Sequence, residues 1–216
     1  MPNWCENEVT ISGKASELVR FKEHVRGKSA HNQTVSFSFH EILPMPNDLR
    51  GTSSPASIVT KKQYDDWMKS AYEKRRQQEL EVDYTVDMEI IDGRPITEAM
   101  SNRFIKKYGS DNWYDWSVDN WGTKWDNNED SVSFSEDSEN LYYDFDTAWE
   151  PPQGIYNALA KEFPTLDITW QYEEPSMGLS GYLEIDADFD NQISSMEMSK
   201  KIADLVKGVK VRELST

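Results

Sequence analysis

The stretch WCENEVTISGKASELVRFKEHVRG, residues 4–27, decides the fold, because it changes from a strand pattern to a helix pattern at Gly13. Before Gly13, apolar and polar residues alternate with a period of two, which predicts a strand over 4–11. After it, one helical face carries the apolar residues Leu18, Phe21 and Val25. Gly27 is the expected C-terminal cap of this helix. A strand followed at once by an amphipathic helix indicates an α+β protein.

Similar patterns predict the rest of the core. In chain order we expect a strand over 33–43, a hairpin of 131–135 and 140–145, a helix between Pro152 and Pro164, a second hairpin of 166–172 and 179–185, and a C-terminal helix at about 195–207. Strand, helix, strand, hairpin, helix and hairpin is the order of a ferredoxin-like antiparallel sheet with helices packed on one face.

Residues from about 47 to 110 differ from the core, because a loop containing Gly, Ser and Pro leads into helical patterns. The first of these, over 60–80, has one apolar face made of Tyr64, Trp67, Met68, Ala71 and Tyr72. The second begins after Pro95, with Thr97 as a cap, and ends at Gly109. We therefore expect one ferredoxin-like domain over 1–216 that carries a helical insertion at about 47–110.

The charge balance limits the partners. The chain has 23 basic and 39 acidic residues, a formal net charge of -16, which repels phosphate backbones and disfavours direct nucleic-acid binding. The same charge attracts a basic protein, including one that itself binds nucleic acid. No leader peptide or membrane span is evident in the sequence, so we expect a cytoplasmic protein of a bacterial host cell.

Cysteine and histidine usage excludes several site types. The chain has one cysteine, Cys5, so it has no intramolecular disulfide and no CxxC motif. The three histidines, His24, His31 and His40, are not spaced as a zinc site. Signatures of serine hydrolases, dinucleotide-binding folds and phosphate loops are also absent from the sequence.

The stretch NWYDWSVDNWGTKWD, residues 112–126, concentrates aromatic and acidic side chains. Its candidates for binding a ligand or partner are Trp113, Tyr114, Asp115, Trp116, Asp119 and Lys124. On a helix, Asp115 and Asp119 would share one face and resemble the paired carboxylates of a glycosidase. Alternatively, the aspartates cap turns and the tryptophans, together with Trp4 and Trp149, fill the aromatic centre of the core. The second interpretation leaves the acidic rim of the stretch for binding.

A second acidic stretch, DADFDNQISSME at 186–197, matches the calcium loop of an EF-hand. The proposed ligands are Asp186, Asp188 and Asp190, the backbone carbonyl of Gln192, and Glu197 as the bidentate ligand. Asn191 replaces the usual glycine and also tolerates a left-handed backbone. The alternative is an acidic turn with a serine N-cap that binds no metal. The pattern predicts calcium as a possible ligand and no other cofactor.

Three motifs together resemble one family: MPNWCENEVTISG at the N-terminus, YDWSVDNWGTKWD in the centre, and FDTAWEPP followed by a helix that ends in FP. They are similar to the YubB-like ferredoxin-like proteins of plasmids and bacteriophages, a family of uncharacterised function. The resemblance implies a ferredoxin-like fold and an origin in a mobile element, and it supplies no catalytic residue.

These observations favour a non-enzymatic interaction protein that engages a host protein through an acidic and aromatic surface. Two alternatives stay open: a nucleotide or sugar binder with a pocket made of tryptophans, and a calcium-binding acidic domain. Enzymatic activity is the least favoured, since no complete catalytic motif is present and a fold does not dictate chemistry.

Overall fold

A computed structural model describes residues 3–28, 34–77, 92–127 and 129–184. The chain divides into two compact units, one made of Met1–Pro44 and Ser117–Thr216 and the other of Met45–Trp116. The range of the second unit, Met45–Trp116, is similar to the range of about 47–110 predicted for the insertion. Each unit is described separately below.

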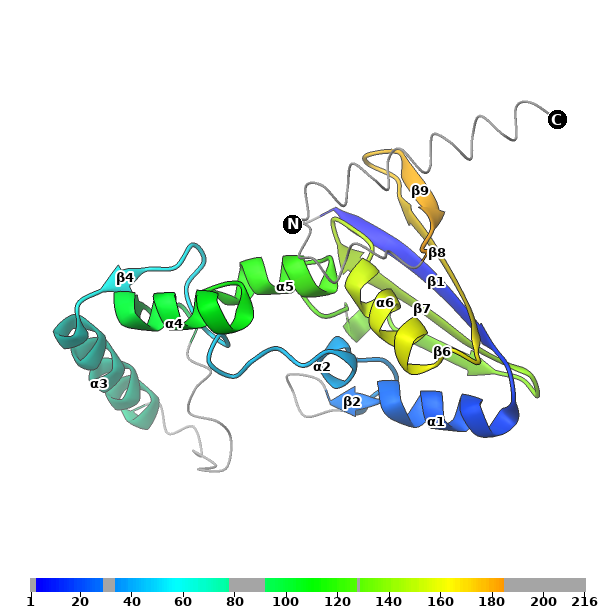
Figure 1. Ribbon diagram of the computed structural model, residues 1–216, viewed down its shortest axis with the longest axis horizontal. Coiled ribbons are helices and arrows are strands. Elements are labelled where there is room, and N and C mark those ends of the chain that lie inside the picture. Colours follow the sequence, from blue (N-terminus) through cyan, green and yellow to red (C-terminus); the bar gives the residue numbers. More distant parts are fainter. Residues whose placement is uncertain (1–2, 29–33, 78–91, 128, 185–216) are drawn as a thin grey trace. The chain divides into compact units, whose positions relative to one another are not determined.

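The first unit is built on a five-stranded sheet with the strand order β6-β7-β1-β8-β9 (Figure 1). Its strands are β1 (Trp4–Ser12), β6 (Ser133–Glu136), β7 (Asn140–Ala148), β8 (Asp167–Glu174) and β9 (Leu179–Tyr182). All neighbouring strands are antiparallel. The two long helices are α1 (Ala15–Val25), between β1 and β6, and α6 (Gln153–Glu162), between β7 and β8. This split β-α-β arrangement is the ferredoxin-like topology, with β9 as an added edge strand, and it confirms the predicted α+β fold.

The core lies between the sheet and these two helices. In β1 every second residue from Cys5 to Ile11 is buried, and the residues between them are more exposed, as expected for a sheet covered on one face. Aromatic rings fill the layer: Phe21 of α1 lies against Tyr143 of β7, and Tyr156 of α6 lies against Trp170 of β8. Burial of such large rings is the main source of stability here.

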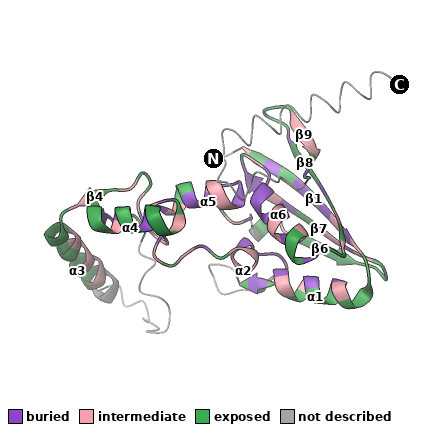
Figure 2. Ribbon diagram, viewed as in Figure 1, coloured by how far each residue is buried: buried purple, intermediate pink, exposed green. Residues whose placement is uncertain are grey.

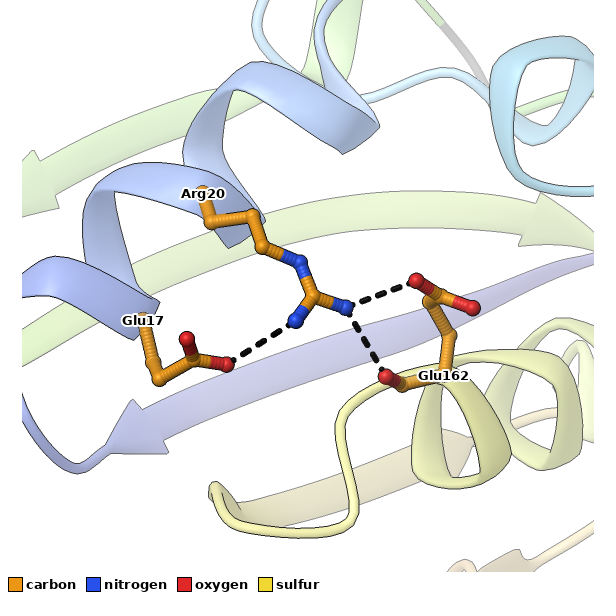
Figure 3. Close-up of polar contacts among 3 residues, drawn as sticks. All are labelled: Glu17, Arg20 and Glu162. Atoms are coloured by element: carbon orange, nitrogen blue, oxygen red, sulfur yellow. Dashed lines mark hydrogen bonds and ion pairs between the residues drawn. The ribbon is translucent and has the colours of Figure 1, made fainter.

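Helices α1 and α6 are also joined at the surface by Arg20 (Figure 3). Its guanidinium donates to the Glu17 carboxylate at 3.1 Å, and to the Glu162 carboxylate and backbone carbonyl at 2.7 and 3.0 Å. It also lies 4.3 Å above the ring of Phe163. The contact to a terminal carbonyl satisfies one of the acceptors that a helix leaves unpaired at its C-terminus. Exposed ion pairs of this kind contribute less than about 1 kcal/mol each.

The strand predicted over 33–43 is wrong in its larger part. Among the described residues of this range, 34–43, only Thr34–Val35 form a strand, β3, which pairs with β2 (Gly27–Lys28), and Phe39–Ile42 form a short helix, α2. The carboxylate of Asp126 accepts hydrogen bonds from the backbone N–H groups of Phe39 and His40 at 2.9 and 3.3 Å. It therefore caps α2 from a distant part of the chain and replaces the local strand pattern by a helical turn.

Gly27 is likewise not the cap that was predicted. Helix α1 ends at Val25, its C-cap residue Arg26 is extended, and Gly27 is the first residue of β2. A Cβ atom at Gly27 would lie 2.7 Å from side-chain atoms of Ser38 and Glu41. The glycine is therefore required by close packing against α2 and not by helix termination.

The second unit contains α3 (Lys61–Gln77) and α4 (Glu98–Tyr108), with β4 (Ile58–Val59) and β5 (Ile96–Thr97) forming a short parallel pair. Both caps predicted for α4 are present. The Thr97 hydroxyl accepts from the Met100 N–H, and Gly109 closes the helix with a φ of 84°. The apolar face predicted for α3 is only half-buried among the described residues. The C-terminal helix predicted at about 195–207 lies outside the described residues.

Candidate functional site: the open face of the sheet

The face of the sheet opposite α1 and α6 is acidic, and we call it the open face. It carries Glu6 and Glu8 of β1, Asp144 and Asp146 of β7, and Glu173 of β8. All of them except the half-buried Asp146 are exposed, and the alternation of buried and exposed positions along these strands is visible in Figure 2. Because the buried residues face the helices, the strand period of two places these carboxylates on the other side.

The register of the strands puts these carboxylates directly beside each other. Glu6 is paired with Asp146 on one side and with Glu173 on the other, and Glu8 is paired with Asp144. Directly opposite residues of an antiparallel pair have Cβ atoms about 4.5–5.5 Å apart, and like charges in these positions destabilise the sheet. Five carboxylates on three neighbouring strands therefore work against folding. None of the residues paired with Glu6 or Glu8 in the neighbouring strands is basic.

Aromatic side chains lie at two ends of the same face. Trp4 begins β1 on the side of Glu6 and is 37% exposed, and Tyr182 of β9 is paired with Gln171 and is 59% exposed. Exposed Trp and Tyr are the residue types that most often anchor protein interfaces. The open face thus combines charge with aromatic anchors, although neither Trp4 nor Tyr182 was among the predicted site residues.

Trp149, directly after β7, has an unusual backbone. Its φ is 73°, and the Glu150 N–H donates to the Ala148 carbonyl at 3.0 Å, which closes a tight turn around it. The Thr123 hydroxyl donates to the Ala148 carbonyl at 2.8 Å, and the Thr147 hydroxyl donates to the Glu150 carbonyl at 2.8 Å. A left-handed backbone is rare for so bulky a residue, and here it leaves the indole 41% exposed.

The prediction that the tryptophans fill one aromatic core is wrong in part. Trp116 and Trp121 are buried, at 5% and 1% exposure, whereas Trp4, Trp125 and Trp149 are exposed. The indole N–H of Trp121 donates to the Leu43 carbonyl at 2.8 Å. Trp121 is therefore a structural residue. Trp125, which was predicted to be buried, is exposed.

Most of the predicted binding residues lie on helix α5 (Trp113–Trp121). The boundary between the two units falls inside this helix, after Trp116. Trp113, Tyr114, Asp115 and Trp116 thus belong to the second unit, and Asp119 and Lys124 to the first. Tyr114 is 38% exposed and Trp113 is half-buried.

Asp115 has a structural contact at the start of α5. The Asn112 side chain accepts from the Asp115 N–H at 3.0 Å and donates to its carboxylate at 2.7 Å, a reciprocal capping arrangement. Lys124 places its ammonium 3.7 Å above the ring of Trp125, a cation–π contact at the surface. These geometries agree with the capping interpretation of the aspartate.

Groups that could carry chemistry are few in the described part of the chain. Burial raises the pKa of the Cys5 thiol to about 12, so the thiol is protonated at neutral pH and is a poor nucleophile. No group of three acidic, histidine or cysteine side chains in the described ranges is arranged to hold a metal ion. The predicted calcium ligands, Asp186 to Glu197, lie outside the described residues.

One comparison with known proteins agrees with the topology. A family model described as the ferredoxin-like domain in Api92-like protein matches residues 120–207. The fold is ferredoxin-like. Among solved structures, the crystal structure of the protein api92 from Yersinia pseudotuberculosis is 14% identical, covers 84% of this chain and 93% of its own, and has a TM-score of 0.41. No curated protein sequence matches the chain.

Sequence reasoning missed the open face because its residues come from separate segments. The signal was present in the alternation of charged residues in each strand, most clearly in Glu6 and Glu8. Only the register shows that they meet carboxylates of other strands.

Every helix among the described residues is too short or too polar to cross a bilayer.

Proposed function

We propose that this protein is a non-enzymatic interaction protein that binds a basic partner protein through the open face. The observation that carries the proposal is the direct pairing of Glu6 with Asp146 and Glu173, and of Glu8 with Asp144. Like charges in these positions reduce the stability of the fold. Their presence therefore indicates that they serve a function such as binding. A partner with Lys and Arg side chains removes this repulsion when it binds.

The charge of the chain selects among occupants of this face. A nucleic acid is repelled by a net charge of -16, and so is a second copy of the same chain. A basic protein is attracted over long range, and charge complementarity of this kind accelerates association. Trp4 and Tyr182 then supply apolar contacts at the margins. A host protein that binds nucleic acid has the required surface.

The resemblance to YubB-like proteins implies that this protein is encoded by a plasmid or a phage. A protein carried by a mobile element in the bacterial cytoplasm meets host nucleic-acid-binding proteins, which are basic. An acidic sheet face that occupies the basic surface of such a protein would compete with its nucleic acid.

Affinity capture with three matched proteins tests the proposal. The baits are the wild type, a face variant and a control variant that each remove three negative charges. The face variant is Glu6→Gln, Glu8→Gln and Asp144→Asn, and the control is Glu23→Gln, Asp130→Asn and Glu139→Gln. The control residues are exposed and lie outside the open face.

We expect basic bacterial proteins to be retained by the wild type and by the control, and to be lost from the face variant. Added nucleic acid and salt of about 0.3 M should release them, because the contacts are electrostatic. Equal capture by all three baits, or capture that resists salt, would refute a role for the open face. Loss from both variants would show a general effect of charge and would also refute it.

Calcium binding by Asp186 to Glu197 is a separate proposal. It is supported by the spacing of oxygen ligands in the sequence. We expect the melting temperature to rise in about 1 mM calcium and the rise to vanish in a Glu197→Gln variant. An unchanged melting temperature of the wild type would remove this proposal.

The nucleotide or sugar alternative predicts quenching of tryptophan fluorescence by such ligands.

A further inference from the structure

A cavity of about 370 Å³ lies at the edge of the first unit, away from the residues of the open face. Its lining residues come from α1, from β3 and the residue after it, from the turn into β2, and from strands β6 and β7. They are Lys22, Arg26, Thr34, Ser36, Phe134 and Tyr143. Their chemistry is basic and hydroxylic, in contrast to the acidic charge of the whole chain. The volume is at the lower end of cavities that hold small molecules.

One of the lining residues, Tyr143, has a buried polar group without a partner. Tyr143 is fully buried, and its hydroxyl makes no hydrogen bond in the structure. Three aromatic rings surround its ring, with Phe37 at 5.2 Å, Phe134 at 4.9 Å and Phe21 at 6.3 Å between centroids. An unsatisfied buried hydroxyl is destabilising, and phenylalanine would fill the same space without this cost. A ligand that accepts a hydrogen bond from this hydroxyl would remove the cost.

Two cations line the same cavity. The Lys22 ammonium pairs with the Glu136 carboxylate at 2.7 Å, so this pair carries no net charge. Arg26 is exposed and forms no ion pair in the described part of the chain, so its charge is available. A guanidinium binds the two oxygens of a carboxylate or phosphate through parallel hydrogen bonds. The net charge of these three side chains is positive in a protein that is otherwise strongly acidic.

The hairpin of β2 and β3 adds hydroxyl groups. Gly27 pairs with Val35 and Lys28 with Thr34, so the strand period of two puts Thr34 and Ser36 on one face of the hairpin, the face that lines the cavity. Phe134, 36% exposed and paired across the strands with Tyr143, supplies a flat apolar wall. Cations, hydroxyls and an aromatic wall together suit an anion that carries a flat organic group.

We propose that this cavity binds a small organic anion, with its phosphate or carboxylate group held by Arg26 and hydrogen-bonded by the Tyr143 hydroxyl, and its flat part against Phe134. Burial and the Glu136 charge raise the pKa of Tyr143, so the phenol keeps its proton and acts as a donor. The exposed Phe134 ring must shift to admit the anion to this hydroxyl, since the hydroxyl itself is closed to solvent. The site is independent of the open face.

Titration calorimetry of the full chain with three probes tests the site: inorganic phosphate, adenosine 5′-monophosphate and benzoate. We expect saturable binding of at least one organic probe that is tighter than that of inorganic phosphate, because Phe134 adds apolar contact. The variants Arg26→Gln and Tyr143→Phe should each weaken this binding by about 10-fold or more. Lys161→Gln makes the same charge change at an exposed position outside the cavity and should have no effect.

The free protein gives a second measurement. Tyr143→Phe removes the unpaired hydroxyl and should raise the melting temperature by a few degrees while it weakens binding. Opposite effects on stability and binding distinguish a ligand-binding hydroxyl from a packing residue. Absence of saturable binding by all three probes would overturn the proposal. Binding that is unchanged by both variants would overturn it as well, whatever the capture experiment on the open face shows.

Discussion

At the scale of single residues, Asn7 holds the three central strands together from within the core. Its side-chain amide donates to the Phe145 carbonyl at 3.2 Å and to the Thr147 hydroxyl at 2.9 Å, and its oxygen accepts from the indole of Trp170 at 3.1 Å. It is 1% exposed. A buried amide with all these partners connects β1 to both neighbouring strands, and removal leaves several polar groups unpaired.

We therefore expect Asn7→Ala to lower the free energy of unfolding by about 3 kcal/mol, since it leaves buried donors unsatisfied and creates a cavity. Urea denaturation followed by tryptophan fluorescence measures this change. Thr169→Ala, at an exposed position of β8, is the control and should cost less than about 1 kcal/mol. A loss of similar size in both variants would contradict the role of Asn7.

Asp126 is the second residue whose role depends on the fold. Its carboxylate accepts from Ser38, Phe39, His40 and its neighbour Asn127. Burial raises its pKa from 3.8 to about 6, and these hydrogen bonds, which favour the ionised form, limit the rise. The folded protein thus binds a proton at Asp126 more tightly than the unfolded chain does.

The sign of the pH dependence follows from this difference. A raised folded pKa contributes stability that is fully present below about pH 4 and is lost as the pH rises through about 6. Relative to Asp126→Asn, the wild type should therefore gain about 1 kcal/mol when the pH falls from about 7 to 5. Urea denaturation of both proteins at the two pH values checks this gain. A constant difference would show that Asp126 does not titrate in this window.

At the scale of elements, the end of α5 depends on a close approach that no helix pattern reveals. Gly122 follows α5 with a φ of 89°, and its N–H donates to the Val118 carbonyl at 3.1 Å. A Cβ atom there would lie 2.8 Å from the backbone nitrogen of Gln153, at the start of α6. Gly122 therefore serves both as a helix cap and as a contact between two helices.

Two alanine variants separate these effects. Gly178, in the turn between β8 and β9, has a φ of 64° but open space where a Cβ would be placed. Gly178→Ala should cost about 1 kcal/mol from the left-handed backbone alone. Gly122→Ala should cost about 3 kcal/mol or more, because backbone atoms of α6 must also move. Equal losses in thermal or urea unfolding would show that the contact with Gln153 relaxes freely.

At the scale of the whole molecule, the open face limits stability through its charge. Glu6 has a carboxylate directly opposite on each side, so Glu6→Gln should raise the free energy of unfolding by about 0.5 kcal/mol at low salt. Salt of about 0.5 M should remove most of this gain by screening. Glu23→Gln on α1, away from these pairs, is the control. A gain that does not depend on salt would indicate that repulsion is not its cause.

Local patterns predicted much of this architecture correctly. Helices α1, α4 and α6 and both hairpins were predicted from periodicity and from proline and glycine positions, because these signals act within a few residues. The strand over 33–43 failed because its helical turn is capped by Asp126, which lies far along the chain. The tryptophan-rich stretch was predicted as a binding site because its residues are adjacent in sequence, and that site stays a prediction. Only the tertiary structure shows that the boundary between the two units falls inside the stretch.

The sequence by itself determined the ferredoxin-like order of elements, the acidic charge and the exclusion of several catalytic motifs, since composition and periodicity are local properties. The tertiary structure alone decided which charges meet. Glu6, Asp146 and Glu173 become neighbours through the register of three strands, and Arg26, directly after α1, lines the same cavity as Tyr143 of β7. Both surfaces depend on pairings between distant segments, which hydrogen-bond register fixes and sequence spacing does not.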